Sequence, residues 1–220
     1  MRWIALLVGA GCVTGRHGAA QGRVAGRVTL LEKGGKAASD LGAAVVYLEG
    51  GSAARPVSAD VAINDKEFVP RVIVVPVGST VRFLNHDPFD HNVFSAAEPA
   101  FDLGQYGRGQ TRDWTFTSPG LARVFCNIHP RMVVFVEVMT SRYFTQASAD
   151  GTFEIADVPP GRWVLHAWHE RSPEVTRELT VTAAGATGVE LQLDARGFRW
   201  TPHKNKYGRD YPTNAGRERY

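Results

Sequence analysis

Short apolar runs separated by turn-forming residues recur along most of the chain. Residues 80–84 and 111–116 alternate apolar and polar side chains, which is the period of a strand with one buried face. No long apolar stripe repeats every 3.6 residues, as a major helix would require. The pattern therefore predicts an all-β protein with many turns.

The same pattern places a strand wherever such a run lies between turn signals. The expected strands are 24–31, 43–48, 68–77, 80–84, 91–94, 111–116, 121–125, 132–138, 150–155, 162–169, 174–182 and 187–193. Residues 52–67 and 96–110 carry no such run, so the first is expected to be a polar link and the second a Gly-rich loop.

Candidate metal chemistry concentrates in one stretch, Cys-Asn-Ile-His-Pro-Arg-Met, which holds Cys126, His129 and Met132. A second imidazole, His91, lies upstream beside Asn92. Two imidazoles and a thiolate with a weak axial thioether suit a copper ion that cycles between two oxidation states. Zinc is the rival, but structural zinc sites rarely use a thioether. The competing interpretation is a small buried cysteine and a core methionine.

The first twenty residues are expected to be a secretory signal peptide. A basic start is followed by an apolar run at 4–13, and Ala19 and Ala20 offer a cleavage site. That run is too short to span a bilayer, which needs roughly 20 residues. Cleavage removes Cys12, whose lipidation is a minor alternative, and leaves Cys126 without a disulfide partner. The sequence therefore predicts a periplasmic protein with no membrane span.

The remaining candidate groups are weaker. His86 and Asp87 belong to the turn before His91, and Asp90 is expected either to support the site or to face solvent. His166 and His169 should point to opposite faces of one strand and act as packing residues. His203 is expected to be solvated. No nucleophile triad, paired-carboxylate site or phosphate loop is visible, and four protein ligands leave a metal no open position, so the protein is predicted not to be an enzyme.

The Cys-x-x-His-Pro-x-Met run, with a His-Asn pair on an earlier strand, resembles the cupredoxins, the small blue copper proteins. The spacing of His129 and Met132 is most similar to amicyanin, and the resemblance covers roughly residues 57–138. It implies a Greek-key β-sandwich, one type 1 copper ion and single-electron transport between protein redox partners. It also implies that Asn92 ties its strand to the cysteine loop and that Pro130 stiffens that loop. Similar chains are described as methylamine utilisation proteins.

Residues 141–194 resemble the carboxypeptidase regulatory-like, transthyretin-like β-sandwich, a smaller module. That module opens with a Gly-x-Val strand and an Ala-Val strand, which occur here at 26–28 and 44–46. The expected organisation is a signal peptide at 1–20, a split sandwich at 22–50 and 141–194, a copper domain at 52–139 and a basic aromatic tail at 195–220. The alternative is two domains in series, with 22–50 as extra strands of the first.

The charge is uneven along the chain. The net charge of +3 comes from the signal and the tail, because the tail carries a net +5 and residues 21–195 carry −4. Nothing indicates nucleic-acid binding. Aromatic residues in the tail predict that part of it packs on the body, and a flexible docking arm is the competing view. Two other functions stay open: a copper carrier or sensor without electron transfer, and a structural sandwich protein with an incidental metal site.

Overall fold

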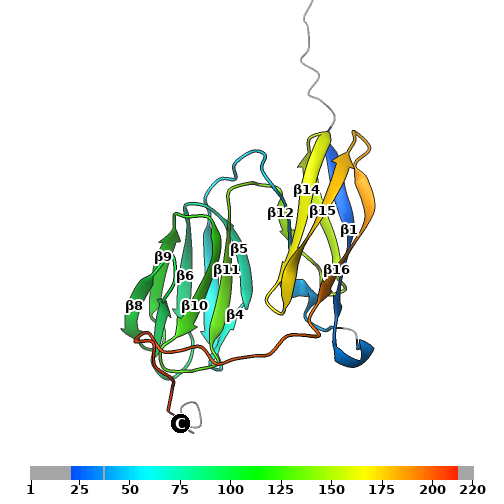
Figure 1. Ribbon diagram of the computed structural model, residues 1–220. Helices are drawn as coiled ribbons and strands as arrows, with labels where there is room; N and C mark the ends of the chain where they lie inside the picture. The colour runs from blue at the N-terminus through cyan, green and yellow to red at the C-terminus, as the bar shows by residue number, and fades with distance from the viewer. Residues whose placement is uncertain (1–20, 37, 213–220) are drawn as a thin grey trace, which may run out of the picture.

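The computed structural model describes residues 21–36 and 38–212. The predicted signal peptide, with Cys12, lies outside the described residues. Four β-sheets form two sandwiches that lie side by side (Figure 1). This confirms the all-β prediction. No helix in the described part of the chain is long and apolar enough to cross a membrane.

The first sandwich, called here the ligand-loop sandwich, contains strands β3 to β11. One sheet has the order β5-β11-β10-β7-β8. Its strands are Val72–Pro76, Val133–Met139, Gly120–Cys126, His91–Ser95 and Phe101–Tyr106. The other sheet has the order β4-β3-β6-β9, with strands Glu67–Val69, Ser58–Asn64, Ser79–Asn85 and Thr111–Phe116. Apolar side chains that alternate with polar ones fill the core between the sheets.

The second sandwich, called here the flanking sandwich, draws on both ends of the described chain. Its sheets have the orders β13-β1-β16 and β12-β2-β14-β15. The strands are Gly22–Leu31, Val45–Leu48, Phe144–Gln146, Thr152–Val158, Gly161–His169, Ser172–Val181 and Ala186–Asp194. Strand β1 pairs with β13 and β16, and β2 pairs with β12 and β14. Gly26 is needed in the parallel β1–β16 pair, because a Cβ there would lie 1.8 Å from the carbonyl oxygen of Val189.

A third apolar cluster lies between the two sandwiches. Strand β11 sends Val134, Val136 and Val138 into the ligand-loop core, while its alternate residues face the flanking sandwich. Phe135 meets Trp168 of β14 with ring centroids 5.6 Å apart. The seam is therefore built from the second faces of strands that already line a core, which is why β11 is buried along its whole length.

Two stretches differ from the sequence predictions. Residues expected to form a polar link contain β3, in which Val61 and Ile63 are fully buried and the outer neighbours, Asp60 and Asn64, are exposed. The expected Gly-rich loop contains β8, which pairs with β7. In both strands polar, charged or small residues interrupt the apolar ones, so pairing with neighbouring strands outweighs a weak intrinsic preference.

The chain after β16 crosses from the flanking sandwich to the end of the ligand-loop sandwich (Figure 1). The prediction that His203 is solvated is wrong. Its imidazole is half-buried and stacks on Phe125 with ring centroids 4.3 Å apart. Lys206 pairs with Asp102 at 2.6 Å. Residues 198–212 therefore pack, at least in part, on the body of the protein.

Candidate metal centre

Adjacent strands bring the predicted ligands to one end of a sheet. Cys126 ends β10 and His91 begins β7, and these strands are antiparallel neighbours. The chain then turns back into β11. The backbone N–H of Met132 donates to His129 at 3.2 Å, and that of Cys126 donates to Met132 at 3.3 Å. The tight turn keeps all of the loop's candidate donors next to the end of β10.

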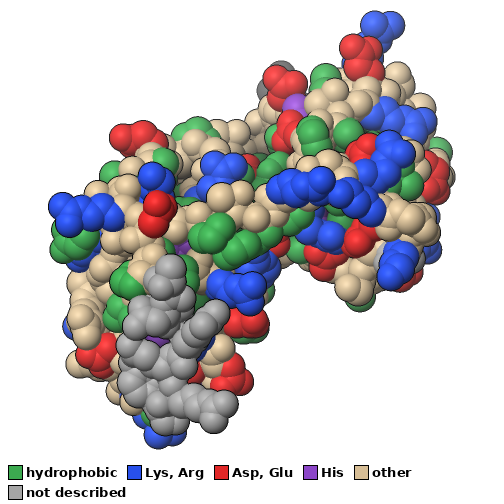
Figure 2. Space-filling view, turned by 60° about the horizontal axis from the view of Figure 1, so that its bottom comes forward, with side chains coloured by type: hydrophobic (Ala, Val, Ile, Leu, Met, Phe, Trp, Pro, Cys, Tyr) green, Lys and Arg blue, Asp and Glu red, His purple; other side chains and the backbone are tan. Residues whose placement is uncertain are grey.

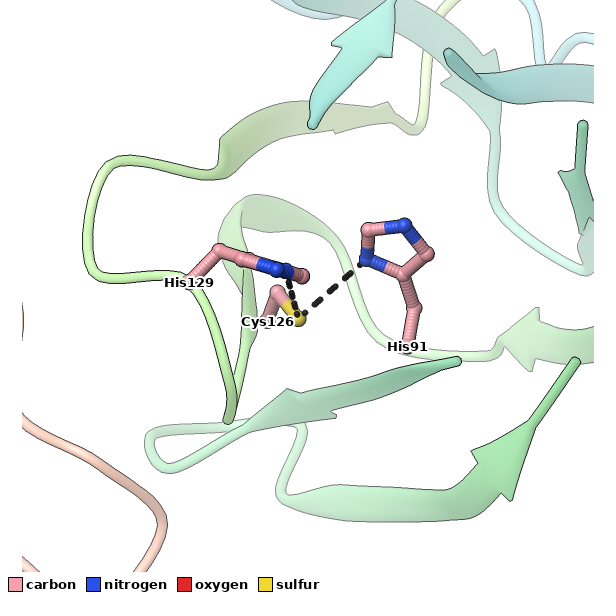
Figure 3. A group of neighbouring side chains, drawn as sticks. All are labelled: His91, Cys126 and His129. Atoms are coloured by element: carbon pink, nitrogen blue, oxygen red, sulfur yellow. Dashed lines mark hydrogen bonds between the residues drawn. The ribbon is translucent and has the colours of Figure 1, made fainter. Parts of the chain in front are cut away.

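Three donor atoms converge in the interior (Figure 3). The Sγ atom of Cys126 lies 3.6 Å from Nδ1 of His91 and 3.6 Å from Nδ1 of His129. All three donor atoms lie within 4.8 Å of one another, and no other His, Cys, Asp or Glu in the described residues joins the group. Cys126 and His91 are fully buried and His129 is 5% exposed. Met132, the fourth predicted ligand, is 1% exposed beside them.

These distances fit a shared metal ion. Imidazole nitrogen and thiolate sulfur bind a divalent first-row ion at about 2.0 and about 2.3 Å, so donors on one ion lie roughly 3.6 to 3.8 Å apart. The observed 3.6 Å separations match that spacing. The donor types, two imidazoles and a thiolate with a buried thioether nearby, are those of a copper site used for electron transfer.

Burial shapes the chemistry of the cysteine. It raises the pKa of the Cys126 thiol, and backbone N–H groups of Asn92, Ile128 and His129 oppose that rise. The N–H of Ile128 lies 3.4 Å from the sulfur. A thiolate in this apolar position needs a neighbouring positive charge, which a bound metal ion supplies.

Asp87 is the supporting residue that the sequence interpretation missed. Its Oδ2 lies 2.8 Å from Nε2 of His91. Backbone N–H groups of Asp65 and Lys66 donate to the same carboxylate at 2.7 and 3.0 Å. Burial lowers the pKa of His91, so the ring is neutral, with its proton on Nε2 toward the carboxylate. The Nδ1 lone pair then faces the sulfur, as a metal ligand requires.

A short-range signal for Asp87 was present in the sequence. The side chain of Asn85 accepts a hydrogen bond from the backbone N–H of Asp87 at 2.9 Å, an Asx-turn that an Asn-x-Asp sequence favours. This turn orients the Asp87 carboxylate toward the interior, where it is 3% exposed. Asp90, named as a possible supporting residue, instead accepts from Gln105 at the surface. His86 is exposed and outside the cluster.

The expected role of Asn92 needs correction. Its side chain donates to Asp102 at 2.6 Å and to the carbonyl of Gly104 at 3.0 Å, so it ties β7 to β8. The bond to the cysteine loop is made by its backbone, because the carbonyl of Asn92 accepts from Asn127 at 2.8 Å. Pro130 lines a groove of about 890 Å³ that also borders His129, which places it at the accessible side of the loop.

The other predicted packing histidines lie in the flanking sandwich, away from this cluster. His166 stacks on Tyr47 with centroids 4.6 Å apart and bonds Glu174 at 2.8 Å. His169 is fully buried, and Arg171 donates its backbone N–H to the imidazole Nδ1 at 3.2 Å.

Residues 55–139 match the family model of copper binding proteins of the plastocyanin/azurin family. Among solved structures, a copper-containing nitrite reductase from Thermus scotoductus SA-01 is 30% identical over 41% of this chain, with a TM-score of 0.36. A purple cupredoxin from Nitrosopumilus maritimus is 24% identical over 37% of this chain and 99% of its own, with a TM-score of 0.34. A reduced amicyanin mutant is 25% identical over 43% of this chain and 98% of its own, with a TM-score of 0.36.

The match spans only 24% of the nitrite reductase, so that enzyme's activity is not transferred to this chain. No curated protein matches the sequence. Residues 55–139 thus form a cupredoxin domain of the plastocyanin/azurin family, and the cofactor that this family binds is copper.

Proposed function

We propose that this protein carries single electrons between protein redox partners in the periplasm, through one type 1 copper ion held by His91, Cys126, His129 and Met132. The observation that carries the proposal is the convergence of two imidazole Nδ1 atoms on one buried sulfur, each at 3.6 Å. Copper bound there supplies a one-electron couple. The contribution of the protein chain is to hold the four ligand side chains in place.

Rigid placement of the ligands supports electron transfer over reversible copper delivery. His91 and Cys126 stand on paired strands, and Asp87 fixes the ring of His91. A site whose ligands hardly move between two charge states needs little reorganisation when an electron arrives. Burial of all four side chains also separates the site from water-borne copper acceptors. Four protein donors leave no open position for a substrate, which supports the proposal that the protein is not an enzyme.

An optical spectrum of the mature protein with one equivalent of copper tests the proposal. The oxidised complex should show intense visible absorption from the thiolate–copper pair, and a reductant should bleach it. Cys126→Ser should abolish the band, while His86→Ala, which changes an exposed histidine outside the cluster, should preserve it. A colourless oxidised complex at one equivalent would refute the assignment.

The proposed location rests on the sequence of residues 1–20 and on Cys126, the only cysteine left after cleavage. The mature protein should be recovered from the periplasmic fraction with Gln21 as its first residue. Recovery of the uncleaved chain from the cytoplasm would contradict it.

Strand pairing supports a further part of the proposal, that a copper domain at 52–139 is inserted into a sandwich formed by 22–50 and 141–194. Strands β1 and β2 pair with strands from 144–194. The two points where the chain passes between the sandwiches lie next to each other. Ala53 and Ser141 form an antiparallel bridge, and the backbone N–H of Arg142 donates to the carbonyl oxygen of Ser52 at 2.9 Å. An insertion is tolerated when its ends lie close together at a surface turn. The likeness of this sandwich to the regulatory-like module stays a prediction.

A further inference from the structure

A groove of about 480 Å³ lies where both sandwiches and the C-terminal tail meet. We call it the arginine groove, because four arginines line it with one acidic residue. Arg71, Arg123 and Arg131 come from the ligand-loop sandwich, Glu170 comes from the β14–β15 turn, and Arg199 comes from the tail. Figure 2, which brings this end of the molecule forward, shows Lys and Arg side chains along the seam between the two lobes.

Most of this positive charge is not neutralised within the described chain. The Glu170 side chain is 8% exposed and is already paired with Arg71, whose Nη2 donates to Oε2 of Glu170 at 2.8 Å. Within residues 21–36 and 38–212, no carboxylate forms an ion pair with Arg123, Arg131 or Arg199. The groove therefore presents three exposed guanidinium groups in a chain whose body is acidic overall.

The C-terminal tail holds one of these three guanidinium groups in place. Arg131 lies over the ring of Trp200, with its Cζ 5.3 Å from the ring centroid. Stacking on an aromatic face holds the planar guanidinium while leaving its N–H groups free to donate at their edge. A guanidinium so placed suits a carboxylate, which it binds with two parallel hydrogen bonds.

The position of the groove links it to the ligand loop. Pro130 and Arg131 belong to that loop and line the arginine groove. The neighbouring groove, which borders His129, shares Arg71, Pro130, Arg131 and Trp200 with it. A molecule seated against Arg131 therefore sits beside the part of the loop that leads to a ligand imidazole.

We propose that the arginine groove is the docking surface for the redox partner, and that the partner presents an acidic segment to it. Complementary charge speeds and orients encounter more than it sets affinity, which suits a carrier that must bind and leave quickly. That the partner is a redox protein rests on the proposed function, but binding to the groove can be tested without copper.

The test measures binding of a fluorescein-labelled hexaglutamate peptide to the copper-free protein by fluorescence anisotropy. The variant combines Arg123→Gln, Arg131→Gln and Arg199→Gln. The matched control combines Arg55→Gln, Arg162→Gln and Arg177→Gln, three exposed arginines outside the groove, so both variants lose the same charge. At low salt, the groove variant should bind about tenfold more weakly than the control, as the loss of three exposed charge pairs implies. The difference should fade at high salt.

A second measurement uses the copper(I) protein and two small oxidants. Hexacyanoferrate(III) is an anion and tris(phenanthroline)cobalt(III) is a cation, and each accepts one electron from copper(I). The groove variant should slow the reaction with the anion and not with the cation, relative to the control. Absence of the visible copper band would refute the proposed function, while the peptide assay would still report on the groove.

Three outcomes would overturn the inference. Equal peptide binding by the groove variant and the control would show that the arginines act only through net charge. Equal slowing of both oxidants would show a general effect on the site. Self-association at low salt that the groove variant abolishes would assign the groove to a second copy of this chain.

Discussion

The hydroxyl of Tyr211 donates a hydrogen bond of 2.8 Å to the carbonyl oxygen of Cys126, a residue 85 positions earlier in the chain. Lys206 adds a second link, because its backbone N–H donates to the side chain of Asn127 at 2.9 Å. The C-terminal segment thus holds the backbone of the ligand loop from outside the ligand-loop sandwich. The two contacts join the last strand of the flanking sandwich to the candidate metal centre.

Replacing Tyr211 with Phe removes that hydrogen bond and keeps the ring. The expected loss in the free energy of unfolding is about 1 kcal/mol, the usual net contribution of such a bond. Copper should also leave the site faster, since the loop has lost one of its restraints. Thermal denaturation and transfer of copper to a chelator measure the two effects. Tyr207→Phe is the control, because that residue is 72% exposed; identical behaviour of the two variants would show that the tail does not restrain the loop.

Asp87 should matter for copper affinity although it is not a predicted ligand. Asp87→Asn keeps the size of the side chain but removes the charge that accepts from His91 and from two backbone N–H groups. Loss of such a supporting partner weakens metal binding by roughly 10- to 100-fold. Competition for copper with a chelator of known affinity measures this loss of affinity. Asp90→Asn is the matched control and should leave the affinity unchanged; a similar drop in both variants would remove Asp87 from this role.

The sequence was most informative where the relevant residues are close together along the chain. Cys126, His129 and Met132 occupy one loop, so their types and spacing could be interpreted directly, and the structure brings Cys126 and His129 together with His91. Their role as copper ligands stays a prediction. The strands β3 and β8 were missed because polar, charged or small residues interrupt their apolar ones, and pairing with β6 and with β7 holds them in the sheets.

Contacts formed by distant segments could not be inferred from spacing. His203 was expected to face solvent because it lies in the C-terminal tail, yet it stacks on Phe125. Its burial depends on the path of the tail after β16, which no local pattern encodes. Glu137 is a similar case, since it lies in an otherwise apolar strand and is buried only because a second sandwich covers that face of β11.

The insertion proposal predicts that the flanking sandwich folds without the copper domain. Residues 54–140 can be replaced by Asn-Gly, a two-residue turn that joins antiparallel partners, because Ala53 already pairs with Ser141. The shortened protein should unfold cooperatively, as followed by circular dichroism. The same deletion with Val46→Asp, which puts a charge in the flanking core, should not.

The deletion also uncovers the apolar seam, which could cause aggregation on its own. A second shortened protein therefore carries Val45→Thr and Trp168→Gln, two residues that face the seam and not the flanking core. If neither shortened protein shows a cooperative transition, the flanking sandwich depends on the copper domain and the insertion proposal fails.

Glu137 makes the seam sensitive to pH. Its side chain is 9% exposed, and its Oε2 has no hydrogen-bond partner in the described chain. Burial, together with the nearby charge of Glu174, raises the pKa of Glu137 from 4.5 to about 7. Tyr47 donates a 2.8 Å hydrogen bond to Glu174 and so holds that second carboxylate in place. The folded protein therefore favours the protonated form of Glu137.

The direction of the pH effect follows from this pKa. Between pH 4.5 and about 7, the folded state binds a proton that the unfolded state has released, so stability should fall as pH rises through this range. The free energy of unfolding should fall by about 3 kcal/mol in total across this pH range, at 1.4 kcal/mol for each pKa unit. Glu137→Gln removes the ionisation and should be more stable than the natural protein at pH 8 by up to that amount, with little difference at pH 5.

Chemical denaturation at pH 5 and pH 8 measures this difference, and Glu178→Gln, which changes an exposed carboxylate, serves as the control. Subtracting the variant from the natural protein cancels all titrating groups that the two share. If the free energy of unfolding changed equally between pH 5 and pH 8 in Glu137→Gln and in the natural protein, Glu137 would ionise freely in the folded state. The seam would then have to open or admit water at neutral pH, and the close packing of Phe135 against Trp168 could not persist there.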